Sequence, residues 1–348
     1  MAVSDFFHNM LLKLPPETAH NIGKWAMKHR LSAPGKFETP ESKIRLFDVD
    51  LPNPFGIAAG FDKYAELHDV VQDYGFGWIE GGSFTLHGGR GNDILRLFRL
   101  SDGGLLNRMG LNCVPSYIAA EKYIRARNKF SFAPSIAKTH DPSITGDRAI
   151  EDIADSYRFL GGFGIYVAIN ISCPNTKEGK TFEEPDSFKD LVNALKEIGK
   201  RRPIVFKFSP GLETRKLEKL VEISHDFADG YEAVNTLPYE HSLYGKRGLS
   251  GPGLDKISAE TIVSLREMTD KPIIGVGGIR TGNHAFAMSV GGANVFLCYT
   301  GFVYKHKENP FAGVDFAHKI NREYREIVEY VMNKLESRKT YPTFMSSS

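Results

Sequence analysis

Short apolar runs alternate with helical patterns from about residue 50 onward. Apolar runs bounded by Gly or Pro are typical of strands buried on both faces. Apolar residues that recur every three or four positions predict helices with one buried face. The strand pattern fits the segments 54–59, 77–82, 132–137, 166–171, 204–208, 233–235, 273–276 and 295–299. Helical repeats lie between them, at Ile153, Ala154, Tyr157 and Leu160, at Leu191, Leu195 and Ile198, and at Ile262, Leu265 and Met268.

This alternation predicts the fold class. Eight strands alternating with helices over roughly 250 residues are typical of a closed (β/α)8 TIM barrel, an α/β fold whose chemistry lies at the carboxyl ends of the strands. A doubly wound open sheet is the alternative. The segment 84–112 is too long for a simple connection, and the alternation within 95–100 predicts a strand pair over the mouth of the barrel.

The first 40 residues predict a helical extension outside the barrel. Before the break at Pro15 and Pro16, one helical face consists of Phe6, Phe7, Met10, Leu11 and Leu14; after it, another consists of Ala19, Ile22 and Ala26. Positive charge beside these faces comes from Lys24, Lys28, His29 and Arg30. Such a helix pair can lie on an anionic membrane surface, or it can simply cover the flank of the barrel. We therefore expect an extension at 1–40, a barrel at 41–336 and a frayed tail at 337–348.

Composition bounds the function. With 348 residues, 41% of them hydrophobic, the chain can bury a full core. It has no Arg-rich patch with interleaved aromatics, so nucleic-acid binding is not expected. Cys113, Cys173 and Cys298 lack CxxC spacing, which argues against structural zinc and favours a reducing compartment. No apolar run approaches the roughly 20 residues of a membrane span. We expect neither a bound metal nor a signal or transit peptide.

The most informative motif is the run 169–176, Ile-Asn-Ile-Ser-Cys-Pro-Asn-Thr, at the end of the fourth predicted strand. It places Cys173 between Asn170 and Asn175, and the polar segment 177–180 can close over a ligand. Amide side chains both donate and accept hydrogen bonds, so two of them can hold a flat, imide-like substrate while the thiolate takes a proton. The alternative is a buried cysteine with two asparagines that cap turns.

Other strand ends predict a cofactor. The first strand runs into Ala58, Ala59 and Gly60, small residues that let a flat ring approach the backbone. Lys207 lies in the otherwise apolar fifth strand, where an ammonium is costly unless it meets an anion. The seventh strand ends in glycines and Thr300 follows the eighth, which matches the phosphate site after the last two strands of a barrel. Together these features favour FMN. A barrel lyase with Lys207 as its Schiff-base residue, and a non-catalytic ligand-binding barrel, are the alternatives.

Several motifs carry a resemblance to a known family: Asn-Pro-Phe-Gly-Ile-Ala-Ala-Gly-Phe-Asp-Lys at 53–63, Asn-Arg-Met-Gly at 107–110, Asn-Ile-Ser-Cys-Pro-Asn-Thr at 170–176, Gly-Leu-Ser-Gly at 248–251 and Ile-Gly-Val-Gly-Gly-Ile at 274–279. In this order along one barrel they resemble the dihydroorotate dehydrogenases, from about residue 6 to about residue 320. The start, from Leu14 to His20, resembles the helical extension of the membrane-associated, quinone-reducing class, which the soluble classes lack.

The resemblance implies roles for individual residues. For FMN it implies Ala58, Ala59, Gly60, Lys63, Ser83, Ser135, Asn170, Lys207, Thr236, Ser250, Gly251, Gly277, Gly278, Tyr299 and Thr300. For dihydroorotate and orotate it implies Lys63, Asn107, Arg108, Met109, Gly110, Leu111, Asn170, Asn175, Asn235 and Thr236. Cys173 would remove the C5 proton while C6 delivers a hydride to the flavin. His20, Arg99 and Tyr299 would line the access path of the quinone.

Two positions depart from the family pattern. Cys173 stands where the quinone-reducing class carries Ser, whereas Cys is typical of the soluble classes. A thiol has a reference pKa of about 8.5, so it ionises near neutrality far more readily than a hydroxyl. Ser135 stands where the family has an Asn that faces the flavin, and its shorter hydroxyl loses one contact.

We expect FMN-dependent oxidation of (S)-dihydroorotate to orotate in pyrimidine biosynthesis, with a quinone as electron acceptor. The N-terminal extension favours quinone as the acceptor. A single substitution can exchange the catalytic base, whereas a helix pair together with His20, Arg99 and Tyr299 requires many changes at once. Peripheral attachment to the cytoplasmic side of the cell inner or cytoplasmic membrane is the expected location. The alternatives are a soluble Cys-type enzyme that uses fumarate or NAD, and the barrel lyase.

Overall fold

A computed structural model describes residues 3–31, 33–37, 42–172 and 182–339. Its centre is a closed barrel with the strand order β10-β13-β14-β3-β4-β7-β8-β9. These strands are β3 (Phe55–Asp62), β4 (Trp78–Phe84), β7 (Phe132–Ile136), β8 (Val167–Asn170), β9 (Ile204–Phe208), β10 (Gly230–Ala233), β13 (Ile273–Val276) and β14 (Val295–Cys298). The predicted (β/α)8 barrel is confirmed. The open-sheet alternative is wrong, because β14 pairs with β3 and closes the ring.

The sixth barrel strand differs from its prediction. It spans Gly230–Ala233 rather than 233–235, since Glu232 interrupts the apolar pattern within it. Val234 and Asn235 lie beyond the strand, yet their N–H groups still donate to the carbonyls of Val276 and Phe208, at 2.9 Å each. Asn235 therefore lies at the mouth of the barrel rather than within its wall. The other predicted strands overlap the observed ones.

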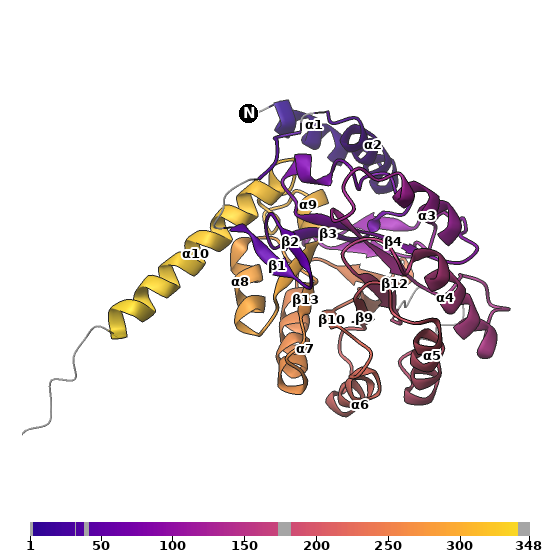
Figure 1. Ribbon diagram of the computed structural model, residues 1–348. Helices are drawn as coiled ribbons and strands as arrows, with labels where there is room; N and C mark the ends of the chain where they lie inside the picture. Colours follow the sequence, from indigo (N-terminus) through magenta and orange to yellow (C-terminus); the bar gives the residue numbers. More distant parts are fainter. Residues whose placement is uncertain (1–2, 32, 38–41, 173–181, 340–348) are drawn as a thin grey trace, which may run out of the picture.

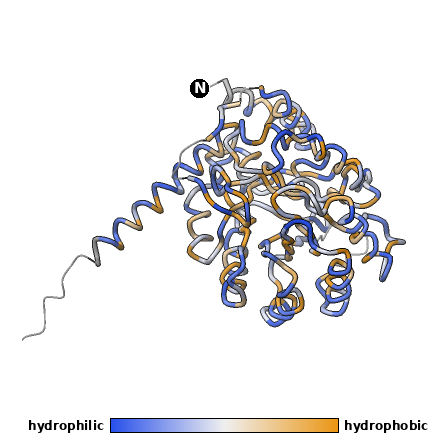
Figure 2. The backbone as a smooth tube through the Cα atoms, viewed as in Figure 1, coloured by the Kyte–Doolittle hydropathy of each residue, from blue (hydrophilic) through white to orange (hydrophobic). Residues whose placement is uncertain are grey.

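Helices cover the outside of the barrel (Figure 1). They are α3 (Ser116–Ile124), α4 (Asp147–Leu160), α5 (Pro185–Ile198), α6 (Thr214–Ser224), α7 (Leu254–Met268), α8 (Gly282–Val290) and α10 (Phe316–Lys339), with the short η2 (Val71–Tyr74) and α9 (Thr300–Val303). Their predicted apolar faces point inward, as the burial of Ile153, Tyr157 and Leu195 indicates. Figure 2 shows the resulting mixture of hydrophilic and hydrophobic residues on these helices.

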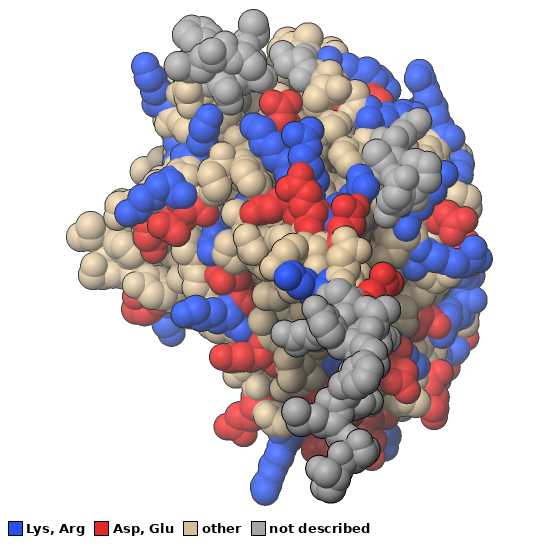
Figure 3. Space-filling view, turned by 90° about the vertical axis from the view of Figure 1, so that its left-hand side faces the viewer, with Lys and Arg blue, Asp and Glu red and all other residues tan. Residues whose placement is uncertain are grey.

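The last helix extends away from the barrel. α10 begins against α8 and then projects beyond the other helices (Figure 1). A frayed tail was expected at 337–348. The backbone of α10 continues up to Lys339, and residues 340–348 lie outside the described part of the chain. On the face seen in Figure 3, Lys and Arg side chains alternate with Asp and Glu side chains. Neither sign of charge dominates that face, in keeping with the net charge of +2.

Different layers close the two ends of the barrel. The hairpin of β1 (Ile44–Leu46) and β2 (Val49–Leu51) covers the end where the strands begin, and its buried leucines pack with Trp78 and Tyr166. A four-stranded sheet, β11-β12-β6-β5, lies over the other end. Its strands are β5 (Leu97–Arg99), β6 (Leu105–Asn107), β11 (Leu237–His241) and β12 (Gly245–Ser250). The strand pair expected within 84–112 is confirmed as β5 and β6, and the sequence patterns did not predict β11 and β12.

The N-terminal extension consists of α1 (Val3–Leu12) and α2 (Pro16–Lys28), which are separated near the expected proline break. Ion pairs attach α2 to the barrel domain: Arg96 binds Glu17 at 2.6 Å, and Lys24 and Lys28 bind Glu66 at 3.1 and 2.9 Å. The side chains of Phe6 and Phe7 lie outside the described part. Among the helices that the structure describes, none combines the length and apolarity needed to cross a bilayer.

Candidate functional site

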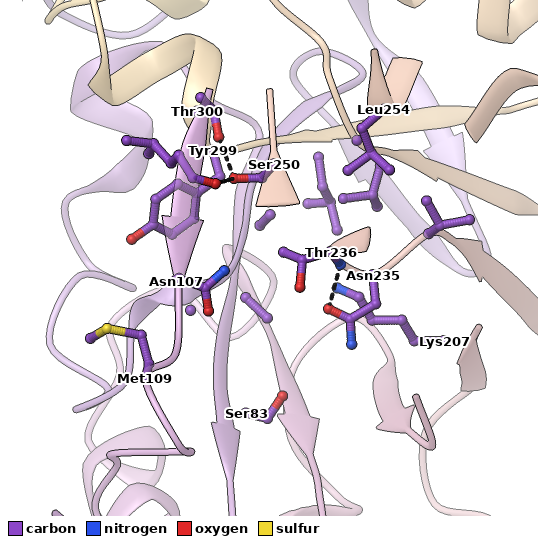
Figure 4. Close-up of a pocket in the computed structure, with 18 of the residues that line it drawn as sticks. Ser83, Asn107, Met109, Lys207, Asn235, Thr236, Ser250, Leu254, Tyr299 and Thr300 are labelled. Atoms are coloured by element: carbon purple, nitrogen blue, oxygen red, sulfur yellow. Dashed lines mark hydrogen bonds between the residues drawn. The ribbon is translucent and has the colours of Figure 1, made fainter. Parts of the chain in front are cut away.

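The carboxyl ends of the barrel strands surround a cavity of about 1130 Å³ that is partly open to solvent. The predicted site residues that line it are Ala58, Ala59, Gly60, Lys63, Ser83, Asn107, Met109, Gly110, Leu111, Asn170, Lys207, Asn235, Thr236, Ser250, Gly277, Gly278, Tyr299 and Thr300. Figure 4 shows that side chains from several strands and from the covering sheet converge on this space.

One wall of the cavity is nearly bare backbone. β3 passes through Ala58, Ala59 and Gly60, where its pairing with β4 shifts register. Gly60 has a φ of +98°, in the left-handed region that other residues adopt only under strain. A side chain at Gly60 would reach to 3.6 Å from the ring of Tyr299. The short side chains leave space for a flat ring to lie against the strand.

Two loops shape the end of the cavity next to β13 and β14. Gly277 and Gly278 have φ angles of +116° and +68°. Gly278 lies so close to the start of α7 that a side chain there would collide with the backbone of Asp255. From the opposite side, the Ser250 Oγ lies 2.8 Å from the Thr300 Oγ1, a contact dashed in Figure 4. These loops follow the last two barrel strands, the usual position of a phosphate site in this fold.

Lys207 meets two buried carboxyl groups inside the barrel. Its Nζ lies 2.6 Å from Oε1 of Glu232 and 3.8 Å from Oε1 of Glu80. The expectation that this ammonium requires an anion is therefore confirmed, although neither glutamate was named from the sequence. A Schiff-base lysine must attack its substrate with a neutral amine, whereas the partner of Lys207 here is a carboxylate at 2.6 Å, the usual partner of an ammonium. This contact argues against the barrel lyase.

A small hydrogen-bond network joins the ends of β8 and β10. The Asn235 Nδ2 donates to Asn170 Oδ1 at 3.2 Å and to Ser172 Oγ at 3.1 Å. The backbone N–H of Ser172 donates to Asn170 Oδ1 at 3.3 Å, and Asn170 Nδ2 donates to Ser83 Oγ at 3.0 Å. The Asn235 Oδ1 accepts from the N–H of Thr236 at 2.8 Å (Figure 4). Ser172, which the sequence did not single out, thus orients both amides.

Asn107 and Lys63 approach the cavity from other elements. The Asn107 Nδ2 donates to the Gly248 carbonyl at 3.1 Å, which ties β6 to β12. Lys63 is buried just beyond β3 and lines the cavity. Burial, and then the nearby charge of Arg96, lower the pKa of Lys63 to about 8. This cation is the natural partner for an anionic group of a ligand.

Some predicted residues lie away from the cavity. Ser135 is fully buried and does not line it, but its Oγ lies 2.8 Å from the Ser83 Oγ. Arg108 lines a separate polar cavity with Arg96 and Arg247. Gly251 follows Ser250 without lining the cavity. Cys173 and Asn175, and with them the predicted base, lie outside the described residues. In the described ranges, no three His, Cys, Asp or Glu side chains are grouped to hold a metal ion.

A second, mostly apolar cavity of about 860 Å³ lies between the helical extension and the barrel. Its lining includes all three residues predicted for quinone access: His20, Arg99 and Tyr299. Tyr299, Leu97 and Leu105 line both cavities, so these side chains form the wall between them. The helices therefore do more than cover the flank of the barrel, because they enclose a space beside the first cavity.

Two polar residues of the second cavity are held in defined states. Burial, and then the charge of Lys63, lower the pKa of His20 to about 3, so its imidazole is neutral at physiological pH. Arg99 Nη1 donates to the carbonyls of Leu12 and Leu14, at 2.9 and 2.8 Å. Arg99 therefore binds the carboxyl end of α1 to β5.

Comparison with known proteins identifies the family. The family model for dihydroorotate dehydrogenase matches residues 42–327, which include the whole barrel. The chain belongs to the dihydroorotate dehydrogenase family. The family model begins at residue 42, so it leaves the N-terminal extension to comparison with individual members.

Individual members of the family match over nearly the full chain. The dihydroorotate dehydrogenase (quinone) of Christiangramia forsetii is 32% identical over 85% of this chain and 92% of its own. Its counterpart in Natronomonas pharaonis is 31% identical over 92% and 93% of the two chains. A crystal structure of DHODH from Eimeria tenella in complex with ferulenol aligns with a TM-score of 0.81 at 25% identity, over 91% of this chain and 93% of the other.

Members of this family are flavin-dependent oxidoreductases, and the first cavity is suited to a flavin. It combines the bare backbone of β3, the ammonium of Lys207 and the glycine turns after β13. The sequence did not indicate three residues near this cavity: Ser172, Glu80 and Glu232. Each contacts a side chain that was predicted for the site, Ser172 the two asparagines and the glutamates Lys207. The sequence could have indicated the two glutamates, since an acidic residue inside an apolar strand is as unusual as Lys207.

Proposed function

We propose that this protein oxidises (S)-dihydroorotate to orotate with bound FMN, in pyrimidine biosynthesis, and passes the electrons to a quinone. The observation that carries the proposal is the pair of adjoining cavities that share Tyr299, Leu97 and Leu105. One cavity is polar enough for a charged substrate beside a flavin. The other is apolar enough for a quinone. Their common wall lets both partners reach a single cofactor in turn.

The chain offers groups for each part of FMN. Ala58, Ala59 and Gly60 would face the flat ring, and Lys207 would lie where the ring gains negative charge on reduction. Gly277, Gly278, Ser250 and Thr300 would surround the phosphate. When bound, FMN would accept a hydride from the substrate and release its electrons to the acceptor. Ser135 would act through Ser83 rather than on the ring directly.

The substrate would be held by complementary polar groups. Lys63 would pair with the carboxylate of dihydroorotate, with the 109–111 backbone nearby. The amides of Asn107, Asn170 and Asn235 would bind the N–H and C=O groups at the edges of the ring. Cys173 directly follows Ser172 in the chain and would take the C5 proton as C6 gives up a hydride. Asn175 and Thr236 would complete the substrate site.

The helical extension would bring the enzyme to its acceptor. Trp25 and Met10 are 55% and 45% exposed on the two helices, and Lys28 on α2 is exposed although it also binds Glu66. Aromatic and apolar side chains beside lysines favour attachment to an anionic membrane surface. A quinone dissolved in the membrane could then enter the apolar cavity. Peripheral attachment on the cytoplasmic side of the cell inner or cytoplasmic membrane follows from this proposal.

A soluble enzyme that uses fumarate or NAD is the second candidate, and the observation that favours it is Cys173 itself. The two candidates differ in the half-reaction that reoxidises the flavin. Anaerobic mixing with dihydroorotate should bleach the flavin absorbance of the purified protein, and a short-chain quinone should restore it faster than fumarate or NAD at equal concentration. Faster recovery with fumarate or NAD would identify the second candidate. Protein purified without flavin would contradict both.

A further inference from the structure

Three ionisable side chains meet inside the barrel: Glu80 on β4, Lys207 on β9 and Glu232 on β10. Glu80 and Glu232 are completely buried and Lys207 is 4% exposed. Glu232 and Lys207 are direct neighbours in the parallel pairing of β10 with β9, so both side chains project to the same face of the sheet. The Nζ of Lys207 lies 2.6 Å from Oε1 of Glu232 and 3.8 Å from Oε1 of Glu80.

Hydrogen bonds determine which oxygen of Glu80 is free to carry a proton. The Trp78 Nε1 can only donate, and it donates to the Tyr166 hydroxyl at 3.3 Å. The Tyr166 hydroxyl in turn donates to Glu80 Oε2 at 3.0 Å. Oε2 of Glu80 therefore acts as an acceptor. Among the described residues, Oε1 of Glu80 and both oxygens of Glu232 have no hydrogen-bond donor, although Oε1 of Glu232 forms the ion pair with Lys207.

The charges in this cluster balance only if one proton is shared. Two ionised carboxylates beside one ammonium would leave an uncompensated negative charge in the dry interior, which is very unfavourable. Burial, and then the negative charge of Glu232, hold the pKa of Glu80 well above its usual range. The side chains of Glu80 and Glu232 are close enough to share a hydrogen bond, so a proton on one carboxyl can be donated to the other.

This cluster lies directly beneath the proposed flavin site. Lys207 lines the first cavity while it contacts Glu232. Ala58, Val276 and Leu297 also line that cavity and belong to the same buried cluster as Trp78 and Tyr166. Whatever net charge the three ionisable groups have is therefore felt by a flavin ring on Lys207.

We propose that Glu80 and Glu232 are positioning residues which share one proton and together carry a single negative charge, so that they neutralise Lys207 and set the reduction potential of the bound flavin. This inference rests on the proposed FMN site. Because the pair acts as a unit, removal of either carboxyl leaves the other to ionise, and the net charge stays the same. Removal of both leaves Lys207 uncompensated, and the positive charge then favours the reduced flavin.

A double-mutant cycle on the FMN-loaded enzyme tests this proposal, with the midpoint potential of the flavin as readout. Glu80→Gln and Glu232→Gln keep the size of each side chain. The midpoint potential reports how much more tightly the protein binds reduced flavin than oxidised flavin. Each single variant should change this ratio of affinities by less than about threefold. The double variant should raise that ratio at least tenfold, a positive shift of about 30 mV for a two-electron couple.

Three patterns of potentials would overturn the proposal. Equal, additive shifts in the two single variants would mean that both carboxyls are ionised in the wild type. No shift in the double variant would mean that both are protonated or that Lys207 is neutral. A shift in one single variant only would mean that the two groups do not share a proton.

Infrared spectroscopy supplies a readout that needs no flavin. Wild-type protein at neutral pH should show the C=O band of a buried carboxylic acid, and this band should disappear in either single variant because the remaining glutamate ionises. Absence of the band in the wild type, or its persistence in both single variants, would overturn the shared proton. Wild-type protein that shows the band but binds no FMN would contradict the proposed function and leave the proton-sharing pair intact.

Discussion

The rings of His20 and Tyr299 are stacked, with their planes 4° apart and their centroids 6.4 Å apart. His20 belongs to α2 and lines only the apolar cavity, whereas Tyr299 lines both cavities. Phe61 packs edge-on against both rings, with centroids at 5.0 and 5.8 Å. The stack therefore connects the helical extension to the wall of the proposed flavin site. Changes in His20 should affect the exchange of electrons with the acceptor and spare the reaction with substrate.

Replacement of His20 should slow reoxidation selectively. His20→Ala removes the ring that faces the apolar cavity, so we expect flavin reoxidation by quinone to slow at least tenfold, about 1.4 kcal/mol of activation free energy. Flavin reduction by dihydroorotate should change by less than about twofold. Stopped-flow absorbance measures both half-reactions. His20→Phe keeps a stacked aromatic ring but removes its polar nitrogens. If the packing of the ring is what matters, His20→Phe should reoxidise the flavin at nearly the wild-type rate. Equal slowing of both half-reactions in His20→Ala would contradict this role.

Arg99 should contribute to stability as well as to the acceptor site. Arg99→Ala leaves the carbonyls of Leu12 and Leu14 without their donor. Because both bonds are only partly buried and a hydrogen bond contributes about 0.5–1.5 kcal/mol net, the free energy of unfolding should fall by about 1 kcal/mol. Arg99→Lys keeps a charge and part of the donor capacity, so it should recover part of the loss. Urea unfolding measures the stability, and stopped-flow reoxidation measures the effect on quinone. Unchanged stability in Arg99→Ala would mean that these bonds do not hold α1.

Cys173 should act on substrate oxidation and not on cofactor binding. Because the C5 proton needs an acceptor, Cys173→Ala should slow flavin reduction by dihydroorotate about 10²–10⁴-fold while FMN remains bound. Cys173→Ser should retain part of the activity with its pH profile displaced upward, since a hydroxyl ionises less readily than a thiol. Cys113→Ala is the matched control, because Cys113 is a buried free cysteine that does not line the cavity. Near-normal flavin reduction in Cys173→Ala would refute the assignment.

The amides of the network should bind ligand more than they stabilise the fold. Asn235→Ala leaves a polar group of the bound orotate without its hydrogen-bond partner. The dissociation constant for orotate should therefore rise by the equivalent of about 1–3 kcal/mol. Asn53→Ala is the control, since Asn53 is a buried asparagine outside the cavity. Its side chain donates to the Gly75 carbonyl at 2.9 Å and accepts from the N–H of Phe55 at 3.0 Å. Asn53→Ala should lower thermal stability and leave orotate binding unchanged. Calorimetric titration and thermal unfolding give both quantities. The reverse pattern would make Asn235 a structural residue.

Orotate affinity should fall in alkaline solution because of Lys63. The pKa of Lys63 is lowered to about 8, so its ammonium is lost as pH rises through that value in the free enzyme. An anionic ligand needs the charged form, and its affinity should therefore decrease above about pH 8, approaching tenfold for each further pH unit. Below that pH the affinity should be flat. Lys63→Gln should bind orotate weakly at all pH values and lose this dependence. An alkaline decline that persists in Lys63→Gln would assign it to another group.

Most of the architecture could be predicted because it depends on local patterns. Barrel strands buried on both faces read as short apolar runs, and outer helices read as three-to-four-residue repeats. The sixth strand was displaced because Glu232 breaks its run, and β11 and β12 were missed because their side chains are partly exposed and follow no alternation. Small residues, glycines and Lys207 at strand ends indicated the cofactor cavity for a related reason: each is unusual at its own position.

The sequence by itself determined the barrel, the helical extension and the residue types at the mouth, since all of these follow from the order of residues along the chain. Only the tertiary structure decided which side chains meet. Glu80 and Lys207 are far apart in sequence yet lie across one barrel interior, and Ser172 joins Asn170 to Asn235 because β8 and β10 end at the same rim. The common wall at Tyr299 likewise arises from packing of α2 against the barrel. Such contacts depend on closure of the sheet, which no local pattern encodes.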